Sequence, residues 1–176
     1  MTTYWLFSVT EENWWVSRRK GVFGVRDTWK YKPVYELVKP GDALVLYVIR
    51  RGARRFGGKF VGIYHTVSEW YREDRLLWPD EVREARLIYP WRIRIKAVKE
   101  GIADYRELLD KLSFVADKKR PQIYLIGTPA NGGKPVPERD AKTIARFLKP
   151  MKFTKWELVY SPFRWFSDIR IQAISL

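Results

Sequence analysis

Residues 43–67 read ALVLYVIRRGARRFGGKFVGIYHTV, and this stretch predicts the hairpin around which the fold is built. The run 43–49 is continuously apolar, which is typical of a buried strand. The run 59–67 is the returning strand, and the loop between the two strands is rich in arginine. We therefore expect a long hairpin whose tip carries a cluster of positive charge.

The chain before this hairpin predicts a strand, a helix and a short extended segment. Residues 4–9 are apolar and aromatic, which favours a buried first strand. Thr10 is expected to cap a helix whose first turn is acidic and which ends in basic residues before Gly21. Residues 22–25 follow as an extended segment, and residues 33–38 as one or two helical turns.

The chain after the hairpin mixes irregular and regular segments. Residues 70–86 predict an irregular excursion that contains a short helix. Residues 89–98 alternate between apolar and basic side chains, which indicates a half-buried strand with Arg92, Arg94 and Lys96 on an outer basic face. The remaining predicted elements are a helix over 105–112, a strand over 123–126 and an amphipathic helix over 137–148. This pattern predicts an α+β fold, a small curved sheet or partial barrel of about six strands flanked by helices.

The composition excludes several classes of protein. The 176 residues contain no cysteine and a single histidine, His65, so thiolate catalysis, disulfides and an imidazole-rich metal site are ruled out. The acidic residues lie mostly among Lys and Arg, where solvated ion pairs are the expected role. We therefore expect a binding domain with no catalytic residue, metal or cofactor. No apolar run reaches the roughly 18 residues of a membrane span and no signal peptide is evident, which predicts a cytoplasmic protein.

Charge and aromatic content favour a nucleic-acid binder. Lys and Arg number 34 against 20 Asp and Glu, a net charge of +14, and 16% of the residues are aromatic. Basic surfaces attract polyanions because each neutralised phosphate releases counterions, and aromatic faces stack on bases. A thermophilic protein with many surface ion pairs is the alternative, but it does not explain the one-sided charge. The predicted phosphate-binding residues are Arg18, Arg50, Arg51, Arg54, Arg55, Lys118, Lys119 and Arg120.

Several short sequence blocks between about residues 3 and 149 occur in an order that is characteristic of a known domain family. They are Tyr4-Trp5, Glu12-Asn13-Trp14, Gly21-Val22-Phe23-Gly24, Lys39-Pro40-Gly41-Asp42, Val61-Gly62-Ile63-Tyr64, Tyr89-Pro90-Trp91-Arg92-Ile93 and Leu112-Ser113-Phe114 with Lys118-Lys119-Arg120. Together they resemble an EVE domain, the prokaryotic branch of the PUA-like superfamily that is closely related to the YTH domains. The resemblance implies a small curved sheet or barrel flanked by helices. It also implies that the protein captures one extruded, modified base in an aromatic pocket.

The resemblance assigns residues to this pocket. Asn13 matches the asparagine that hydrogen-bonds the base edge, and Gly24 matches the position whose backbone carbonyl meets the exocyclic amine. Phe23 matches the first cage aromatic, where the family has Trp, and Trp78 matches the second. Two further positions lie at the strand end where YTH domains place a polar reader, and they are Ser8 and Val9.

Val9 departs from the polar residue often found at its position. The other residues suit a pocket for a methylated base for physical reasons. A buried methyl group contributes about 0.8 kcal/mol of apolar transfer energy. Two flanking rings would contact that methyl and stack on the base. Asn13 supplies both a donor and an acceptor for a base edge that water no longer reaches.

EVE domains occur alone and as N-terminal specificity domains of McrB-type modification-dependent restriction GTPases, and this sequence is similar to the archaeal ones. On that resemblance, residues 1–150 form the EVE-like domain, and residues 151–176 are an extension that packs on it or leads to a further domain. The expected ligand is methyladenine in DNA, because Asn13 suits an adenine edge, with a GTPase domain in cis and a nuclease subunit in trans. The alternative is a stand-alone module that binds modified RNA. The sequence leaves open DNA against RNA and methyladenine against methylcytosine.

Overall fold

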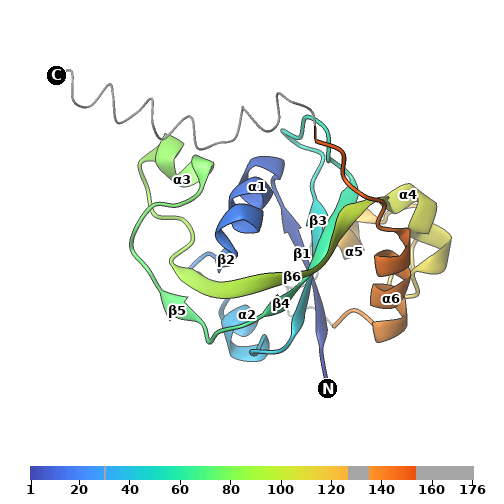
Figure 1. The fold of residues 1–176 in the computed structure, drawn as a ribbon, viewed down its shortest axis with the longest axis horizontal. Helices are drawn as coiled ribbons and strands as arrows, with labels where there is room; N and C mark the ends of the chain where they lie inside the picture. Colours follow the sequence, from blue (N-terminus) through green and yellow to red (C-terminus); the bar gives the residue numbers. More distant parts are fainter. Residues whose placement is uncertain (30, 127–134, 154–176) are drawn as a thin grey trace.

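A curled, mixed sheet forms the centre of the molecule (Figure 1). The computed structural model describes residues 1–29, 31–126 and 135–153. The strands are β1 (Tyr4–Val9), β2 (Val22–Val25), β3 (Ala43–Val48), β4 (Lys59–Thr66), β5 (Tyr71–Arg72) and β6 (Trp91–Asp104). Five of the six strands follow the order β1-β3-β4-β6-β2, and the sixth, β5, pairs with β6 beside this path. β1 is parallel to β3 and the other pairs are antiparallel. The predicted curved sheet is thus confirmed.

The predicted hairpin β3–β4 lies in the middle of the sheet, and both of its faces are covered. Alternate residues of β3 belong to two different hydrophobic clusters, Ala43, Val45 and Tyr47 to one and Leu44, Leu46 and Val48 to the other. Because a strand covered on both faces must be apolar at every position, this arrangement explains the unbroken apolar run in the sequence.

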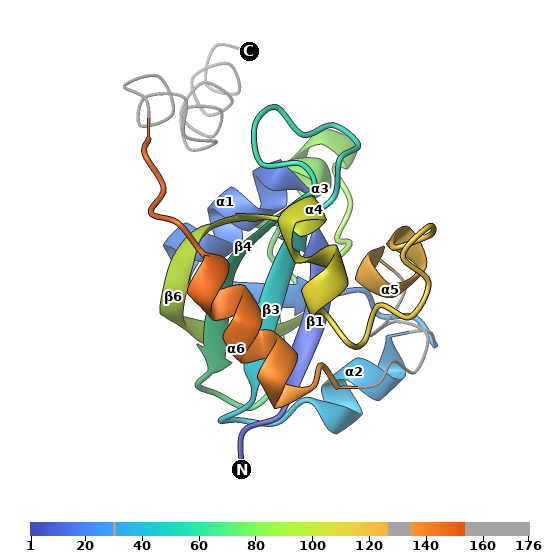
Figure 2. The same ribbon diagram turned by 90° about the vertical axis from the view of Figure 1, so that its right-hand side faces the viewer.

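Helices cover the two faces of the sheet (Figures 1 and 2). They are α1 (Glu11–Lys20), α2 (Lys32–Leu37), α3 (Pro79–Glu84), α4 (Tyr105–Leu108), the 3-10 turn η1 (Leu109–Lys111), α5 (Gln122–Ile126) and α6 (Glu138–Phe147). Side chains of α1 and α2 join one cluster, whereas those of α4 and α6 join the other. The curled sheet with helices on both sides matches the predicted fold class.

The caps of α1 fix its position and confirm the sequence prediction. The Thr10 side chain accepts a hydrogen bond from the backbone N–H of Asn13 at 3.3 Å. Gly21 ends the helix with φ of 62°, a left-handed conformation that glycine adopts without steric cost. Thr10 therefore places Asn13 in the first turn of the helix, next to the end of β1.

Two predicted elements differ in the structure. Residues 123–126 form part of the helix α5, and the predicted strand there is wrong. Pro121 begins this helix by accepting hydrogen bonds from the backbone N–H groups of Tyr124 and Leu125, and only Leu125 is buried in it. β6 extends to Asp104, beyond the predicted end at residue 98, because β4 pairs with it as far as that residue. Tertiary pairing thus extends the strand beyond the residues whose local pattern predicts it.

The segment after α6 returns across the top of the domain. Lys149 bridges to Ile102 of β6, and the Phe153 ring lies 5.3 Å from that of Trp15 on α1. Arg55 of the hairpin tip donates to the backbone carbonyl of Lys152. The rest of the predicted extension 151–176 lies outside the described residues. Among the described helices, none is long and apolar enough to cross a membrane.

Candidate nucleic-acid interface

Three of the predicted pocket residues, Asn13, Gly24 and Trp78, lie together between α1, β2 and the start of α3. Trp78 Nε1 donates to Ser17 Oγ at 3.1 Å, one helical turn beyond Asn13. The far edge of the same indole lies on the backbone of Gly24, so closely that a Cβ at this position would collide with it. Glycine at position 24 is therefore a requirement for this contact.

Trp78 is buried in this arrangement, with 2% of its surface exposed. The Arg92 guanidinium lies over its ring, 5.0 Å from the centroid, and the Tyr89 ring meets it edge to face at 5.1 Å. The indole thus occupies the space against the Gly24 backbone. The resemblance places the amine of a captured base at the backbone carbonyl of the same residue.

Phe23 lies on the other face of β2. Successive residues of a strand point to opposite sides, so Phe23 faces the core while Gly24 faces Trp78. Phe23 is 4% exposed, and its ring packs against Phe7 at 4.8 Å. Within the described residues, no ring contact joins Phe23 to Trp78. The structure therefore places the two predicted cage rings on different faces of the same strand.

Ser8 and Val9 lie at the end of β1, as expected, but they join other neighbours. The Ser8 hydroxyl donates to the backbone carbonyl of Ile126 at 3.4 Å. Val9 is half-buried and packs against the same cluster as Phe23. In the described part of the chain, neither residue forms a hydrogen bond with Asn13 or Trp78. Their role as readers of a base stays a prediction.

Asp80 and Tyr89 complete the surroundings of Asn13. Asp80 Oδ2 accepts hydrogen bonds from Asn13 Nδ2 at 3.0 Å and from the Tyr89 hydroxyl at 2.7 Å. Asn13 Nδ2 also donates to the Tyr89 hydroxyl oxygen at 3.3 Å. Burial, together with the hydrogen bond to Asp80, raises the pKa of Tyr89, so the phenol keeps its proton at neutral pH. These two residues were not predicted, because they meet Asn13 only in the folded chain.

A fully buried carboxylate, Glu81, holds the segment that carries Trp78. One of its oxygens accepts the backbone N–H groups of Leu77 at 2.7 Å and Trp78 at 3.2 Å. The other oxygen accepts those of Ile88 at 2.9 Å and Tyr89 at 2.8 Å. Glu81 therefore ties together both ends of the turn around α3, with the indole between them.

Arg92 holds the same segment from the side of the sheet. The sequence predicts it on an outer basic face with Arg94 and Lys96, but it is fully buried, and that prediction is wrong for this residue. Its guanidinium donates to the Tyr89 carbonyl at 3.1 Å and to Glu73 at 2.9 Å. The excursion over residues 70–86 covers that face of β6, which turns an alternating basic position into an internal one.

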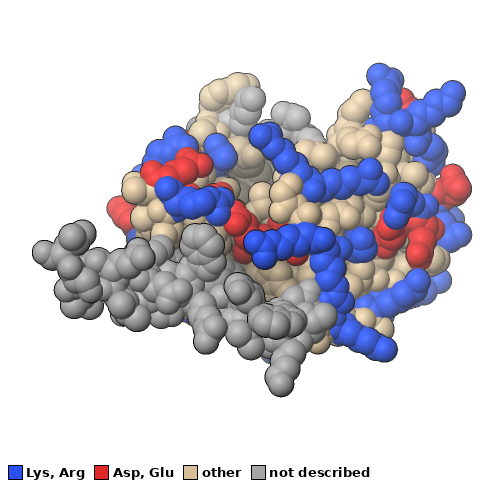
Figure 3. Space-filling model, turned by 90° about the horizontal axis from the view of Figure 1, so that it is seen from above, with Lys and Arg blue, Asp and Glu red and all other residues tan. Residues whose placement is uncertain are grey.

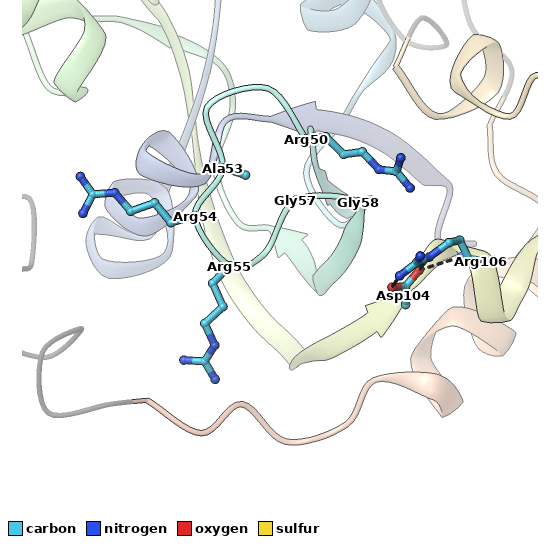
Figure 4. A pocket seen from close by; sticks show the side chains of 8 residues that line it. All are labelled: Arg50, Ala53, Arg54, Arg55, Gly57, Gly58, Asp104 and Arg106. Atoms are coloured by element: carbon cyan, nitrogen blue, oxygen red, sulfur yellow. Dashed lines mark hydrogen bonds and ion pairs between the residues drawn. The ribbon is translucent and has the colours of Figure 1, made fainter.

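Three of the four predicted arginines of the hairpin tip, Arg50, Arg54 and Arg55, line an open pocket of about 300 Å³ (Figure 4). Its lining consists of Arg50, Ala53, Arg54, Arg55, Gly57, Gly58, Asp104 and Arg106. Arg50 donates to the Tyr105 hydroxyl at 2.8 Å, and Arg106 pairs with Asp104 at 2.8 Å. Figure 4 shows Arg54 and Arg55 pointing away from each other and from Arg50. Spread guanidinium groups are suited to several phosphates along a backbone.

The hairpin tip is anchored to the first turn of α1, close to Asn13 in sequence. Glu11 accepts the backbone N–H groups of Arg54 and Arg55 at 3.0 Å each and that of Phe56 at 2.9 Å. These bonds fix the backbone of the tip, from which the exposed Arg51 and Arg54 extend. The side chains of Arg50 and Arg55 bond to the Tyr105 hydroxyl and the Lys152 carbonyl. Figure 3 shows the molecule from above, the side of the hairpin tip, and Lys and Arg predominate on this face.

Of the other predicted phosphate-binding residues, Arg18 lies beside the hairpin tip, over the ring of Trp15, which contacts Phe56, and the run 118–120 lies on a separate loop. Arg18 pairs with Glu100 at 3.0 Å and lies over the Phe153 ring, 5.0 Å from its centroid. The run 118–120 is exposed in the loop before α5. There the Lys118 ammonium donates to the Leu112 carbonyl at 2.7 Å, and Arg120 pairs with Asp117 at 2.8 Å. The structure therefore gathers the hairpin arginines and leaves this run on a separate loop.

The EVE domain family matches residues 3–147 of this chain. A UPF0310 protein of Saccharolobus solfataricus is 37% identical over 147 residues, which cover 84% of this chain and 95% of that protein. A UPF0310 protein of Pyrococcus horikoshii is 36% identical over 151 residues, which cover 83% of this chain and 99% of that protein. These relatives are matched over nearly their whole length, so the similarity concerns the domain described above.

Solved structures share the fold at much lower identity. The YTH domain of the Zygosaccharomyces rouxii MRB1 protein, in complex with N6-methyladenosine RNA, has a TM-score of 0.51 at 17% identity and covers 86% of this chain and 90% of that chain. The YTH domain-containing protein mmi1, solved with RNA, has a TM-score of 0.53 at 12% identity and covers 84% of this chain and 81% of that chain. The half-barrel with flanking helices is therefore common to these proteins.

Proposed function

Because this chain belongs to the EVE domain family, we propose that it binds nucleic acid and captures a methylated base at the site of Asn13, Gly24 and Trp78. The observation that carries the proposal is the indole of Trp78, which lies directly on the Gly24 backbone beside a buried asparagine. A flat aromatic ring already fits this space, so a base of similar shape fits it when the indole moves aside.

Entry of the base requires the Trp78 indole to leave the Gly24 backbone and its hydrogen bond to Ser17. The displaced ring then stacks on the base, which compensates for part of the few kcal/mol that base extrusion costs. Phe23 is the predicted first aromatic ring of the cage, and Trp78 is the second. From its place on the core face, we expect it to act mainly by supporting β2.

The arginines of the hairpin tip are proposed to hold the phosphates on either side of the extruded nucleotide. Such contacts supply affinity without sequence preference. For the ligand we propose methyladenine in DNA, read by the specificity domain of a cytoplasmic McrB-type restriction system. A GTPase domain in cis and a nuclease subunit in trans would then perform all catalysis. The alternative is a stand-alone module that binds modified RNA, as the RNA complexes of the YTH structures suggest.

The experiment that tests the pocket compares two tryptophan variants. Trp78→Ala should weaken binding of a methylated strand by about fivefold to a hundredfold, because a stacking face worth about 1–3 kcal/mol is removed. Binding of the unmethylated strand should change little. Trp70→Ala is the matched control, since Trp70 is half-buried and bonds to the Val38 carbonyl away from the pocket. Fluorescence anisotropy at fixed salt measures both affinities.

Folding controls and a ligand panel complete this test. Each variant needs a Tm that leaves it folded at the assay temperature, because Trp78 is also a buried residue. If folded Trp78→Ala keeps the parent's preference for methylated strands, the pocket assignment is wrong. The panel uses DNA and RNA, single- and double-stranded, with adenine or cytosine methylated or not. Its strongest binder decides between the restriction and the RNA-binding alternatives.

A further inference from the structure

The segment that follows α6, residues 149–153, ends on aromatic residues beside the hairpin tip, and we call it the strap. Two backbone hydrogen bonds between Lys149 and Ile102, at 2.8 and 3.0 Å, fix its start on β6. At its other end the Phe153 ring lies 5.3 Å from the ring of Trp15 on α1. The strap therefore connects the sheet to the helix that also carries Asn13.

Two arginines contact the strap in the way that arginines contact a nucleotide. The Arg18 guanidinium lies over the Phe153 ring, 5.0 Å from its centroid, as such a group lies over a base. The Arg55 guanidinium donates to the backbone carbonyl oxygen of Lys152, as it would to a phosphate oxygen. Figure 4 shows the Arg55 side chain extending toward this segment. A ring and an oxygen on successive residues of the strap thus occupy positions suited to a base and a phosphate.

Trp15 supplies the surface against which the Phe153 ring packs. The indole contacts Trp14 at 4.9 Å and Phe56 at 5.9 Å, yet the residue is only half-buried. The Phe153 ring meets the indole at an angle of 56°, so the two rings are not stacked face to face. A purine or pyrimidine, which is flat, can stack parallel to the indole and contact it over a larger area. The surface therefore suits a base in place of the phenyl ring.

Arg18 has a donor that the described part of the protein leaves unpaired. One guanidinium nitrogen bonds to Glu100 at 3.0 Å, but Nε is buried and has no acceptor among the described residues. Buried donors in proteins are almost always paired. A nucleotide in the place of Phe153 would bring the acceptor atoms of a base or a phosphate next to this group, whereas a phenyl ring brings none. This donor favours a nucleotide over an apolar ligand.

On the basis of the function proposed above, we propose that Trp15, Arg18 and Arg55 form a second nucleotide subsite, which the strap occupies in the unbound protein. Its ligand is an unmodified nucleotide of the strand that supplies the captured base, since stacking accepts any base. Residues 13 and 15 lie on different sides of α1, because an α-helix has about 3.6 residues per turn. The second nucleotide therefore lies beyond the extruded one along the strand. It binds only when the strap leaves, so the strap lowers the apparent affinity.

The first test removes the ring of the strap in the full chain. Phe153→Ala should strengthen binding of single strands by about threefold to tenfold, methylated or not, because the competing strap is held less firmly. Phe147→Ala is the matched control and should leave the affinity unchanged, since Phe147 is half-buried on α6 and packs against the other hydrophobic cluster. Fluorescence anisotropy at fixed salt measures the affinities. A gain in affinity cannot result from misfolding, and an unchanged or weaker affinity for Phe153→Ala overturns the proposal.

The second test identifies the nucleotide that stacks on Trp15. A series of strands, in whichever of DNA or RNA binds more tightly, carries one abasic site each at successive positions on either side of N6-methyladenine. With the parent protein, one of these positions should weaken binding by about fivefold to a hundredfold, because the stacked base is missing. With Trp15→Ala, shown by its Tm to be folded, the same position should no longer matter. An equal response of both proteins at every position overturns the subsite.

The second subsite and the proposed base capture fail separately. If the Phe153 and Trp15 variants behave as expected and the parent shows no preference for methylated strands, the base capture is wrong and the second subsite stands. If the parent prefers methylated strands but neither variant changes binding, the second subsite is wrong. A parent protein that binds no nucleic acid overturns both.

Discussion

Around Trp78, charged side chains are buried and paired inside the protein, whereas at the hairpin tip they extend from the surface. Glu81 and Arg92 are both fully buried, and each bonds to backbone groups of the segment that carries the indole. Arg51 and Arg54 are exposed on a loop whose backbone is held through Glu11. The first region fixes a shape, and the second presents charge.

The difference separates two tasks of a nucleic-acid binder. Buried hydrogen-bonded charges hold a segment in one arrangement, and breaking such a group is costly because its partners stay desolvated. Exposed arginines lose little when they move, so they follow a phosphate backbone of any sequence. We infer that discrimination between bases resides around Trp78 and that general affinity resides in the hairpin tip. The following experiments challenge that division.

The largest effect is expected from Glu81→Ala. Four backbone N–H groups would lose their acceptor inside the protein, and the Arg92 guanidinium would lose a carboxylate 3.8 Å away. This change should lower the free energy of unfolding by about 3–5 kcal/mol. Thermal or urea unfolding measures the change. Glu84→Ala, on the exposed side of the same helix, is the control and should cost less than about 0.5 kcal/mol. Similar losses for both variants would mean that Glu81 does not brace the segment.

A smaller effect, on binding alone, is expected at the hairpin tip. The variant replaces by Gln the residues Arg50, Arg51, Arg54 and Arg55. The slope of log affinity against log salt should fall by about one unit for each phosphate that the protein no longer neutralises, equally for methylated and unmethylated DNA. The charge-matched control replaces by Gln the basic residues on and just after α6, Arg139, Lys142, Arg146 and Lys149. If both variants change the slope equally, net charge rather than the hairpin tip governs affinity.

The smallest effect concerns Asp104 in the arginine-lined cavity. The side-chain hydrogen bond from Arg106 holds the pKa of Asp104 below its usual value. A lowered carboxyl pKa stabilises the fold above the unfolded-state pKa of about 3.9, and this contribution disappears as the pH falls through the lower folded-state pKa. Asp104→Asn should therefore reduce stability at pH 7 by less than about 1 kcal/mol and not at pH 2. Unfolding curves at the two pH values decide, and an equal loss at both would exclude the charge as the cause.

The sequence predicted well wherever the deciding contacts are local. Thr10 and Gly21 mark the ends of α1 because capping involves backbone groups only a few residues away. The strands of the hairpin follow from apolar patterning alone. The error at residues 123–126 has a local cause as well, since apolar residues in a short run suit either a strand or a helix, and Pro121 favours the helix here.

The candidate site was predictable only in part. Asn13, Gly24 and Trp78 came from the resemblance of sequence blocks, and the structure brings them together. The sequence did not indicate that Asp80 and Tyr89 belong to the site. A charged residue in a polar segment, such as Asp80, is expected to be exposed to solvent. For Arg92 the sequence was misleading. The alternation along β6 predicts an exposed side chain, but in the folded protein the segment 70–86 covers this face of the strand. In each case the missing information is a contact between segments far apart in the chain.

By itself, the sequence determined the central hairpin, the caps of α1 and the positive charge of the hairpin tip, because each depends on composition or on neighbours within a few residues. Only the tertiary structure decided which face of β2 carries Phe23, which charges are buried, and which way the Asn13 amide points. Asn13 and Asp80 are 67 positions apart, and Trp78 and Ser17 are 61 apart. The orientation of a side chain in a pocket depends on such long-range partners, since no local pattern specifies what will pack against it.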